Sequence, residues 1–178
     1  MKKSLLLVCL LVGAAQATRY ANNLSLLQPS EVCVGLPMFY MDGRYTSNPT
    51  LSAEVQRILR GEATRLQINI AATPEEDCVG YVYLTVNVQK TIRGFIYVAH
   101  LDLVLQQAQL NDLTSAYMKT TGSSGKAMYA DLWNVEQMGI YEQESMLRPL
   151  TIADSLNLFS LFAEDWKAVH AFSDHDPL

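Results

Sequence analysis

The sequence has few of the residues with which small proteins bind metal ions or nucleic acids. Its 178 residues include three cysteines, three histidines and no run of basic side chains, with 13 Lys and Arg against 18 Asp and Glu. Proteins bind phosphate backbones through clustered Lys and Arg, so this composition argues against a nucleic-acid partner. His170 and His175 are separated by a spacing that fits no single helix face, and no cysteine has a metal-ligand neighbour in sequence. We therefore expect no metal site and no cofactor.

Signatures of nucleotide binding and of nucleophilic catalysis are also missing. The loop Gly122-Ser123-Ser124-Gly125-Lys126 has too few residues between its glycines for a phosphate loop, and Ala127 stands where Ser or Thr is needed. The sequence has no Gly-x-Ser-x-Gly elbow to place a serine nucleophile beside a base such as His100. The acids from Glu75 to Asp77 follow a proline and predict a solvated turn. No catalytic residue is predicted, and a small hydrolase with an unrecognised site is the alternative.

Long hydrophobic runs are confined to the N-terminus. Two lysines precede an apolar run from Leu5 to Ala15, and Ala15-Gln16-Ala17 supplies the small residues typical of a cleavage site. The run is about half as long as a membrane-spanning helix requires. Residues 1–17 are therefore predicted to be a signal peptide, and Cys9 lies too deep in the run to accept a lipid. We expect an exported protein, periplasmic or secreted, with no transmembrane segment after cleavage.

The mature chain has the size of one domain and is acidic. Removing the signal peptide takes away two lysines and no acids, which leaves 161 residues with a net charge of −7. We expect an irregular N-terminal segment at 18–30, a single α+β domain at 31–172 and a frayed tail at 173–178. Cys33 and Cys78 are then the only thiols left. In an oxidising compartment they are predicted to form a disulfide, with two buried free thiols as the alternative.

The clearest structural signal is a long β-hairpin between Cys78 and Gln106. Apolar residues alternate with polar ones on both sides of Thr91-Ile92-Arg93-Gly94, a pattern typical of strands with one buried face. If Lys90 pairs with Phe95 around this four-residue loop, the apolar residues of the two strands lie opposite one another. The predicted pairs are Val82 with Leu103, Leu84 with Leu101, Val86 with Ala99 and Val88 with Tyr97.

The other periodicities predict two helices and three further strands. Strands are expected at 31–40, 64–71 and 127–138, and loops at 41–49, 111–126 and 142–149. One helix is expected from Thr50 to a stop at Gly61, and a longer one from Thr151, with Thr151 as N-cap and Asp154 as a capping-box acid. The fold class that follows is α+β: one mainly antiparallel sheet with a long β-hairpin and two helices packed on one face.

The hairpin register also gathers polar side chains on the face opposite the core. It pairs Thr85 with His100, Tyr83 with Asp102 and Tyr81 with Val104. Tyrosine buries a large area at a low cost in entropy, so such a face suits recognition. The candidate binding residues are Tyr81, Tyr83, Thr85, His100 and Asp102, near Arg65, Gln67 and Asn69 if the strand at 64–71 is a neighbour. The alternative is an ordinary solvated face with stabilising cross-strand pairs.

The order of elements resembles that of small exported envelope proteins of bacteria. The residues that carry the likeness are Leu51 to Gly61, Tyr81 to Leu105, Ala130-Asp131-Leu132-Trp133 and Phe159 to Trp166. The order of its elements is similar to that of the amino-terminal domain of the Tol-system propeller protein and of the lipoproteins that activate cell-wall synthases. It departs from those lipoproteins because it lacks the lipid-accepting cysteine. The resemblance implies a non-enzymatic envelope role and transfers no functional residue.

Together these observations predict an exported, soluble, non-catalytic domain that binds another envelope component. The partner would be an envelope protein or a cell-wall component, held by the outer hairpin face or by a free sheet edge. The sequence leaves the oligomeric state open.

Overall fold

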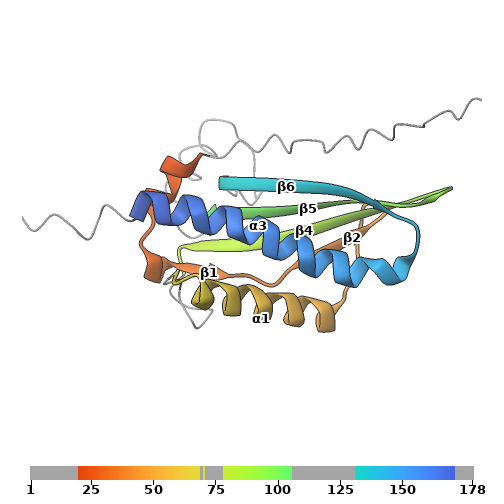
Figure 1. The fold of residues 1–178 in the computed structure, drawn as a ribbon, viewed down its shortest axis with the longest axis horizontal. Helices are drawn as coiled ribbons and strands as arrows, with labels where there is room; N and C mark the ends of the chain where they lie inside the picture. Colours follow the sequence, from red (N-terminus) through yellow and green to blue (C-terminus); the bar gives the residue numbers. More distant parts are fainter. Residues whose placement is uncertain (1–19, 69, 71–77, 106–130, 171–178) are drawn as a thin grey trace, which may run out of the picture.

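A mixed six-stranded sheet and two helices make up the computed structural model, which describes residues 20–68, 70, 78–105 and 131–170 (Figure 1). The strands are β1 (Val32–Val34), β2 (Met38–Met41), β3 (Arg44–Tyr45), β4 (Gly80–Thr91), β5 (Gly94–Leu105) and β6 (Asp131–Tyr141). The helices are α1 (Pro49–Arg65) and α3 (Leu147–His170), with 3-10 turns η1 (Ala21–Leu26), η2 (Pro29–Glu31) and η4 (Glu144–Met146). The α+β class is the one that the sequence predicts.

Some sequence predictions fall on residues that the structure does not describe. The signal peptide with its cleavage residues Ala15 and Ala17, the loop at 111–126 and the tail at 173–178 lie outside the described residues. Within the described ranges, no helix combines the length and the apolar character needed to cross a membrane. The segment expected to be irregular, 18–30, contains η1 and most of η2, and its Leu24 and Leu27 are buried in the core.

The strands follow the order β3-β2-β4-β5-β6, with β1 also paired to β4. Both β1 and β2 run parallel to β4, along successive parts of its length. The sequence predicts a single strand at 31–40, whereas the structure interrupts it between β1 and β2. Gly35 lies against the ring of Tyr83, where a Cβ atom would overlap the ring, and Pro37 has no N–H for the ladder. The loop expected at 41–49 includes β3, which turns back antiparallel onto β2.

The β4–β5 hairpin has the predicted register throughout. Lys90 pairs with Phe95, and the four predicted apolar pairs all lie opposite one another. The turn is tighter than expected, because Thr91 pairs with Gly94 and only Ile92 and Arg93 lie between the strands. Gly94 has a φ of 132° and no room for a Cβ atom beside the Tyr141 carbonyl, so only glycine fits this position.

Helix α1 continues past the stop that the sequence predicts at Gly61. Asn48 caps its N-terminus by accepting a hydrogen bond from the Leu51 N–H at 3.2 Å. Leu51, Val55, Leu59 and Ala63 form one buried stripe, which extends the amphipathic face beyond Gly61. Gly61 is exposed and has open space around its Cα, so nothing there ends the helix. The strand predicted at 64–71 is therefore wrong: residues 64 and 65 are helical, and residues 66–68 and 70 form no strand.

The end of α1 has the two hydrogen bonds of a Schellman motif. Ile68 N–H donates to the Ala63 carbonyl at 2.9 Å, and Gln67 N–H donates to the Thr64 carbonyl at 3.1 Å. Gln67 holds the left-handed conformation with a φ of 57°, which glycine usually supplies at this position. Ile68 is buried because the motif turns it back toward Ala63. Ile68 is apolar because it packs in the cap of the helix. The alternation of Leu66, Ile68 and Ile70, which predicts a strand, does not reflect one here.

Replacing Gln67 by glycine should stabilise the protein. The exposed glutamine carries the steric penalty of a left-handed residue, so Gln67→Gly should raise the free energy of unfolding by about 1 kcal/mol. Urea unfolding followed by circular dichroism measures this directly. Gln67→Ala is the matched control, because alanine keeps the penalty and should give no gain. A glycine variant no more stable than the alanine variant would contradict this description of the cap.

Helix α3 begins at Leu147, four residues before the predicted N-cap. Pro149 lies in its first turn, where a missing N–H leaves no helical hydrogen bond unmade. Thr151 is therefore inside the helix and buried, and Asp154 is buried too; the predicted capping box is wrong. The Asp154 carboxylate accepts hydrogen bonds from Tyr97 and Gln137 of the sheet, whereas the buried Thr151 hydroxyl has no hydrogen-bond partner among the described residues.

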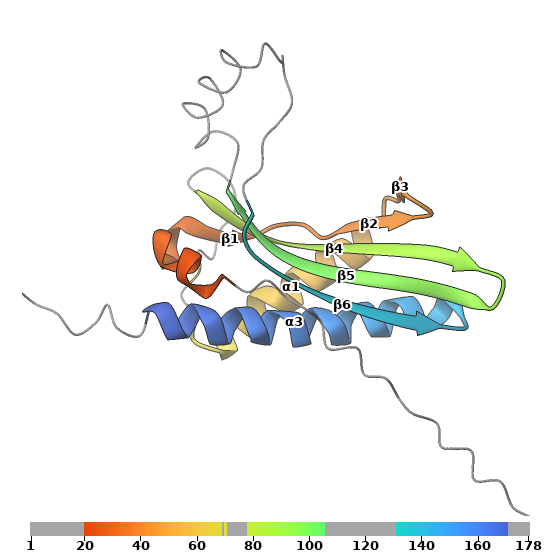
Figure 2. The ribbon, with the colours of Figure 1, turned by 90° about the horizontal axis from the view of Figure 1, so that it is seen from above.

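Both helices pack on one face of the sheet, as predicted (Figure 2). The inward side of α3 carries an aromatic cluster in which Phe162 meets Trp133 of β6 edge to face, with ring centroids 5.3 Å apart. The Trp133 indole N–H donates to Asp165 at 2.8 Å. The start of α3 is joined to α1 by an ion pair between Arg148 and Glu54. The candidate site lies on the opposite face of the sheet, which neither described helix covers.

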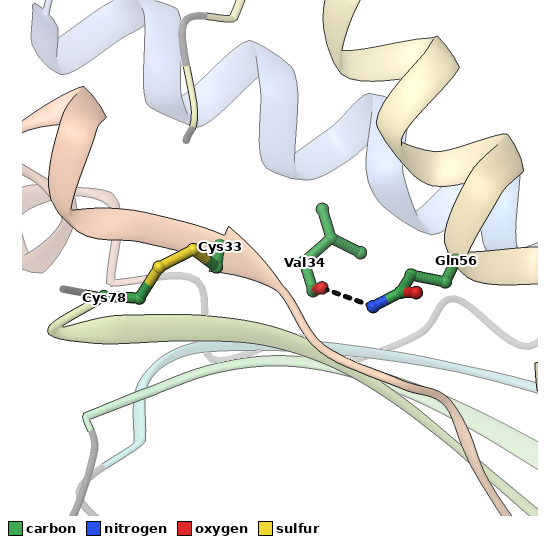
Figure 3. The surroundings of a disulfide bond; sticks show 4 residues. All are labelled: Cys33, Val34, Gln56 and Cys78. Carbon is green, nitrogen blue, oxygen red and sulfur yellow. Dashed lines mark hydrogen bonds between the residues drawn. A yellow bond between two sulfur atoms is a disulfide. The ribbon is translucent and has the colours of Figure 1, made fainter. Parts of the chain in front are cut away.

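The predicted disulfide between Cys33 and Cys78 is present (Figure 3). It joins β1 to the residue two positions before β4, with Cα atoms 5.9 Å apart, and both cysteines are buried. Next to it, the Gln56 side-chain amide on α1 donates to the Val34 carbonyl at 2.9 Å (Figure 3). The bridge and this hydrogen bond hold β1 between β4 and α1.

Candidate functional site

The five candidate binding residues lie together on the sheet face opposite the two helices. The β4–β5 ladder places Thr85 opposite His100, Tyr83 opposite Asp102 and Tyr81 opposite Val104, as predicted. The five candidates are half-buried, whereas their neighbours along each strand point into the core. The juxtaposition is thus confirmed, and the binding role stays a prediction.

The two tyrosines form a stacked pair along β4. Their ring centroids are 5.6 Å apart and their planes are inclined by 23°. The ring of Tyr83 also lies against Gly35, in the segment between β1 and β2. One ring of the stacked pair therefore lies against the segment that separates β1 from β2. Gly35 is what allows the ring to lie so close to the backbone.

Strand β6 adds two residues that the sequence analysis missed. Antiparallel pairing with β5 places Asn134 opposite Asp102 and Glu136 opposite His100. The Glu136 carboxylate is 3.3 Å from Nδ1 of His100. The alternation of Trp133 and Val135 with polar neighbours was a signal for the strand, but it could not set the register against β5. We call the seven residues Tyr81, Tyr83, Thr85, His100, Asp102, Asn134 and Glu136 the outer face.

The predicted neighbours from 64–71 are not part of this surface. Arg65 is the last residue of α1, on the other side of the sheet, and Gln67 belongs to the helix cap. Asn69 is outside the described residues. The correction follows from the longer α1, and it removes the one arginine that the sequence placed near His100 and Asp102.

Carboxylates crowd one end of the outer face. Burial, together with the negative charges of Asp131 and Glu136, raises the pKa of Asp102 to about 6, while His100 acts in the opposite direction. Strands β5 and β6 contain no Lys or Arg. His100 is therefore the only cation that these two strands can offer, and only when it is protonated.

The outer side of the same strands becomes apolar toward the hairpin tip. Met138 and Ile140 of β6 are 73% and 77% exposed, and Ile96 of β5 is 36% exposed. Ile96 pairs with Ile140, and Val98 pairs with Met138. We call these four residues the apolar end. It continues the outer face along β5 and β6, so that acidic and apolar side chains share one surface.

Other candidate residues have structural contacts. Nε2 of His170 is 3.0 Å from the Leu27 carbonyl, and its ring stacks on Trp166 with centroids 4.1 Å apart. These contacts place His170 in the packing of α3 against the N-terminal segment. In the part of the chain that the structure describes, no group of three His, Cys, Asp or Glu is placed to hold a metal ion. The histidine at 175 lies outside that part.

No protein-family model matches the chain, and no curated protein matches it. Among solved structures, the PelC dodecamer from Paraburkholderia phytofirmans is similar over 79% of this chain and 88% of its own, with 10% identity and a TM-score of 0.39. An uncharacterised protein is similar over 76% of this chain and 88% of its own, with 10% identity and a TM-score of 0.37. Likeness at this level carries no inference about function.

Proposed function

We propose that this chain is an exported, non-catalytic binding module that recognises another component of a cell envelope through its outer face. Two features support export. The signal-peptide pattern of residues 1–17 directs a chain out of the cytoplasm, and the Cys33–Cys78 bridge is of a kind that persists in oxidising compartments. The partner is an envelope protein or a cell-wall component.

The observation that carries the proposal is the composition of the sheet face that the helices leave open. Both described helices pack on the other face (Figure 2). The outer face combines stacked tyrosines with a histidine, an amide and carboxylates from three adjacent strands. Aromatic rings give contact area, and the polar groups around them give direction and selectivity.

A pair of double variants tests this surface. Tyr81→Ser with His100→Ser removes one stacked ring and the only titratable cation of the outer face. Tyr83 is avoided, because it also packs against Gly35. Arg57→Ala with Lys167→Ala is the control, since both residues are exposed on the helices. Binding energy concentrates in a few interface residues, so the outer-face variant should capture about a tenth or less of the partner retained by the native protein from envelope extracts.

The control variant should capture as much partner as the native protein. Circular dichroism and thermal unfolding establish that both double variants remain folded. Equal capture by the two variants would show that the outer face is not the recognition surface. If only the helix variant loses capture, the recognition surface lies on α1 and α3 and not on the outer face.

A further inference from the structure

Strand β6 forms one border of the sheet. In the described ranges it pairs only with β5, so its other side presents N–H and C=O groups without a strand partner (Figure 1). The first residues of β6 are covered by η1, whose Asn23 side chain donates to the Leu132 carbonyl at 2.9 Å. The border that remains for a partner runs from Asn134 to Ile140.

This border lacks the usual protection against strand pairing. Proteins blunt sheet edges with lysine, proline or a bulge at the exposed strand. Strand β6 contains no lysine and no proline, and its register irregularity lies at Leu103 and Val104, beside the covered end. The part from Asn134 to Ile140 is regular, and Met138 and Ile140 extend their side chains into solvent. Such an edge is a template for another extended chain.

The charges along the border indicate which kind of strand could pair with β6. Reading from Ile140 back along the outer side of β6, the side chains are apolar, apolar and then acidic at Glu136. Two more carboxylates lie nearby, Asp102 on β5 and Asp131 at the start of β6. Neither β5 nor β6 contains a Lys or Arg. Cross-strand neighbours of opposite charge stabilise a sheet, and like charges destabilise it. A fitting strand is therefore apolar over Ile140 and Met138 and basic over Glu136.

We propose that the β6 edge binds an extended segment of a partner protein by antiparallel strand addition, and that this segment carries two apolar residues and one Lys or Arg at alternate positions. The apolar residues would contact Ile140 and Met138, and the basic residue would contact Glu136 and Asp102. This rests on the proposed function, since it gives the chemistry of a protein partner at the border of the outer face. Main-chain hydrogen bonds supply affinity in this mode, and alternate side chains supply specificity.

A second copy of this chain fits the edge less well. The antiparallel register that places Met138 opposite Ile140 of a second copy also places Glu136 opposite Glu142, and the register that places Met138 opposite itself leaves each Glu136 opposite Ile140 without a cation. Like charges directly opposite each other destabilise a strand pair, and the mature chain has a net charge of −7. A basic partner segment avoids this repulsion and also neutralises Glu136 and Asp102.

A short peptide tests the edge with the intact mature protein. The probe is the fluorescein-labelled, end-capped peptide Ser-Ile-Thr-Val-Thr-Lys-Thr-Lys-Ser, whose Ile, Val and Lys occupy alternate positions. Fluorescence anisotropy should give saturable binding, and replacing both lysines by glutamate should weaken it by at least about tenfold. Two further peptides carry N-methyl groups on alternate residues, one set on the odd and one on the even positions. Only one set should lose binding, because only alternate N–H groups of an added strand face β6.

Matched protein variants locate the peptide. Glu136→Lys should weaken the lysine peptide by at least about tenfold and favour the glutamate peptide instead. Ile140→Ser should weaken both, and Glu164→Lys, an equal charge change at an exposed position on α3, should change neither. The native affinity should also fall as the pH is lowered through about 6, because protonation of Asp102 removes an attractive charge.

Three results would overturn the proposal: no saturable binding up to about 1 mM peptide, equal affinity of the two N-methylated peptides, or a native dimer that Met138→Lys converts to monomer. The last would assign the edge to a second copy. If the peptides fail while Tyr81→Ser with His100→Ser still abolishes partner capture, only the edge proposal fails and the outer face stands. If the peptides bind while that double variant captures partner normally, the edge stands without the outer face.

Discussion

Replacing Cys33 and Cys78 together by alanine should lower the free energy of unfolding by about 4 kcal/mol. The bridge closes a loop with a sequence separation of 45 residues, which contains all of β2, β3 and α1. Opening it gives the unfolded chain back the entropy that the closed loop removes. The Cα atoms of the two cysteines are 5.9 Å apart, which is in the ordinary range for disulfides. Urea unfolding of the native and double-alanine proteins measures the difference.

The fold itself should survive this substitution. Cys33 pairs with Tyr81 in the parallel β1–β4 ladder, and the Val79 N–H donates to the Glu31 carbonyl at 2.8 Å, so β1 keeps its main-chain partners. Reduced native protein is the matched control, because it loses the bond while keeping both sulfur atoms. It should unfold close to the double-alanine variant. A loss below about 1 kcal/mol in both would contradict the role given to this bridge.

Replacing Asp154 by alanine should destabilise the protein by about 3 kcal/mol. Asp154 on α3 is 4% exposed. Its Oδ2 accepts a hydrogen bond from the Tyr97 hydroxyl of β5, and its Oδ1 accepts one from the Gln137 amide of β6 at 2.8 Å. One carboxylate thus joins the helix to two strands. Without it, a buried hydroxyl and an amide lose their acceptor, and leaving such donors unpaired costs more than the net value of the bonds.

Asparagine at the same position should restore part of the stability and remove a pH dependence. Its carbonyl can accept from Gln137 and its NH₂ can donate to the Tyr97 oxygen, so that only the Tyr97 hydroxyl loses its acceptor, and Asp154→Asn should lose about 1.5 kcal/mol relative to the native protein near pH 7. Burial raises the pKa of Asp154 in the folded state, partly opposed by the Tyr97 hydrogen bond. The folded protein therefore binds this proton more tightly than the unfolded chain does.

The sign of the effect follows from that difference in proton affinity. The contribution of Asp154 to stability is greatest below the unfolded-state pKa of about 4 and declines as the pH rises through the raised folded-state pKa. The native protein should therefore gain stability relative to Asp154→Asn as the pH falls from 8 to about 4. Urea unfolding of both proteins across this range measures the gain, and other carboxylates cancel because both proteins share them. A difference that is constant with pH would contradict the raised pKa.

Two neighbouring tyrosines provide a control on the hydrogen bond. The rings of Tyr97 and Tyr141 are 5.7 Å apart, but only the Tyr97 hydroxyl donates to Asp154. The Tyr141 hydroxyl is buried and has no hydrogen-bond partner among the described residues. Tyr97→Phe should destabilise by about 2 kcal/mol, whereas Tyr141→Phe should be neutral or stabilising. Equal losses would mean that packing of the rings, rather than the buried carboxylate, sets the effect.

The hairpin register could be predicted because its evidence is local. Alternation along β4 and β5 left one register that places Val82, Leu84, Val86 and Val88 opposite apolar partners on one face, although the turn is two residues shorter than the loop expected. The disulfide could be predicted for a different reason: the predicted signal peptide contains Cys9, so only Cys33 and Cys78 were left to pair. The hairpin register and the disulfide could both be inferred without knowing how the helices pack on the sheet.

The errors arose where tertiary contacts override a local signal. Gly61 looked like a helix stop, but the buried stripe through Ala63 carries α1 onward. Ile68 looked like a strand residue, but its burial belongs to the cap of α1. Asp154 looked like a capping acid, whereas its partners Tyr97 and Gln137 come from strands distant in sequence. No periodicity in the helix sequence distinguishes these roles.

The candidate site could be predicted in part for the same reasons. Five of its residues come from the hairpin, whose register local alternation determines. Asn134 and Glu136 could not be assigned, because the position of β6 against β5 depends on contacts with α3 and η1. The free border of β6 is likewise a property of strand order, which no single segment encodes.

Photo-cross-linking from the outer face tests the central claim most directly. The protein with p-benzoylphenylalanine in place of Glu136 is exposed to light in an envelope extract, beside a control with the same residue in place of Arg57 on α1. A binding module that works through its outer face should give a discrete adduct from position 136 and none from position 57. An adduct from position 57 alone, or from neither position, would contradict the account.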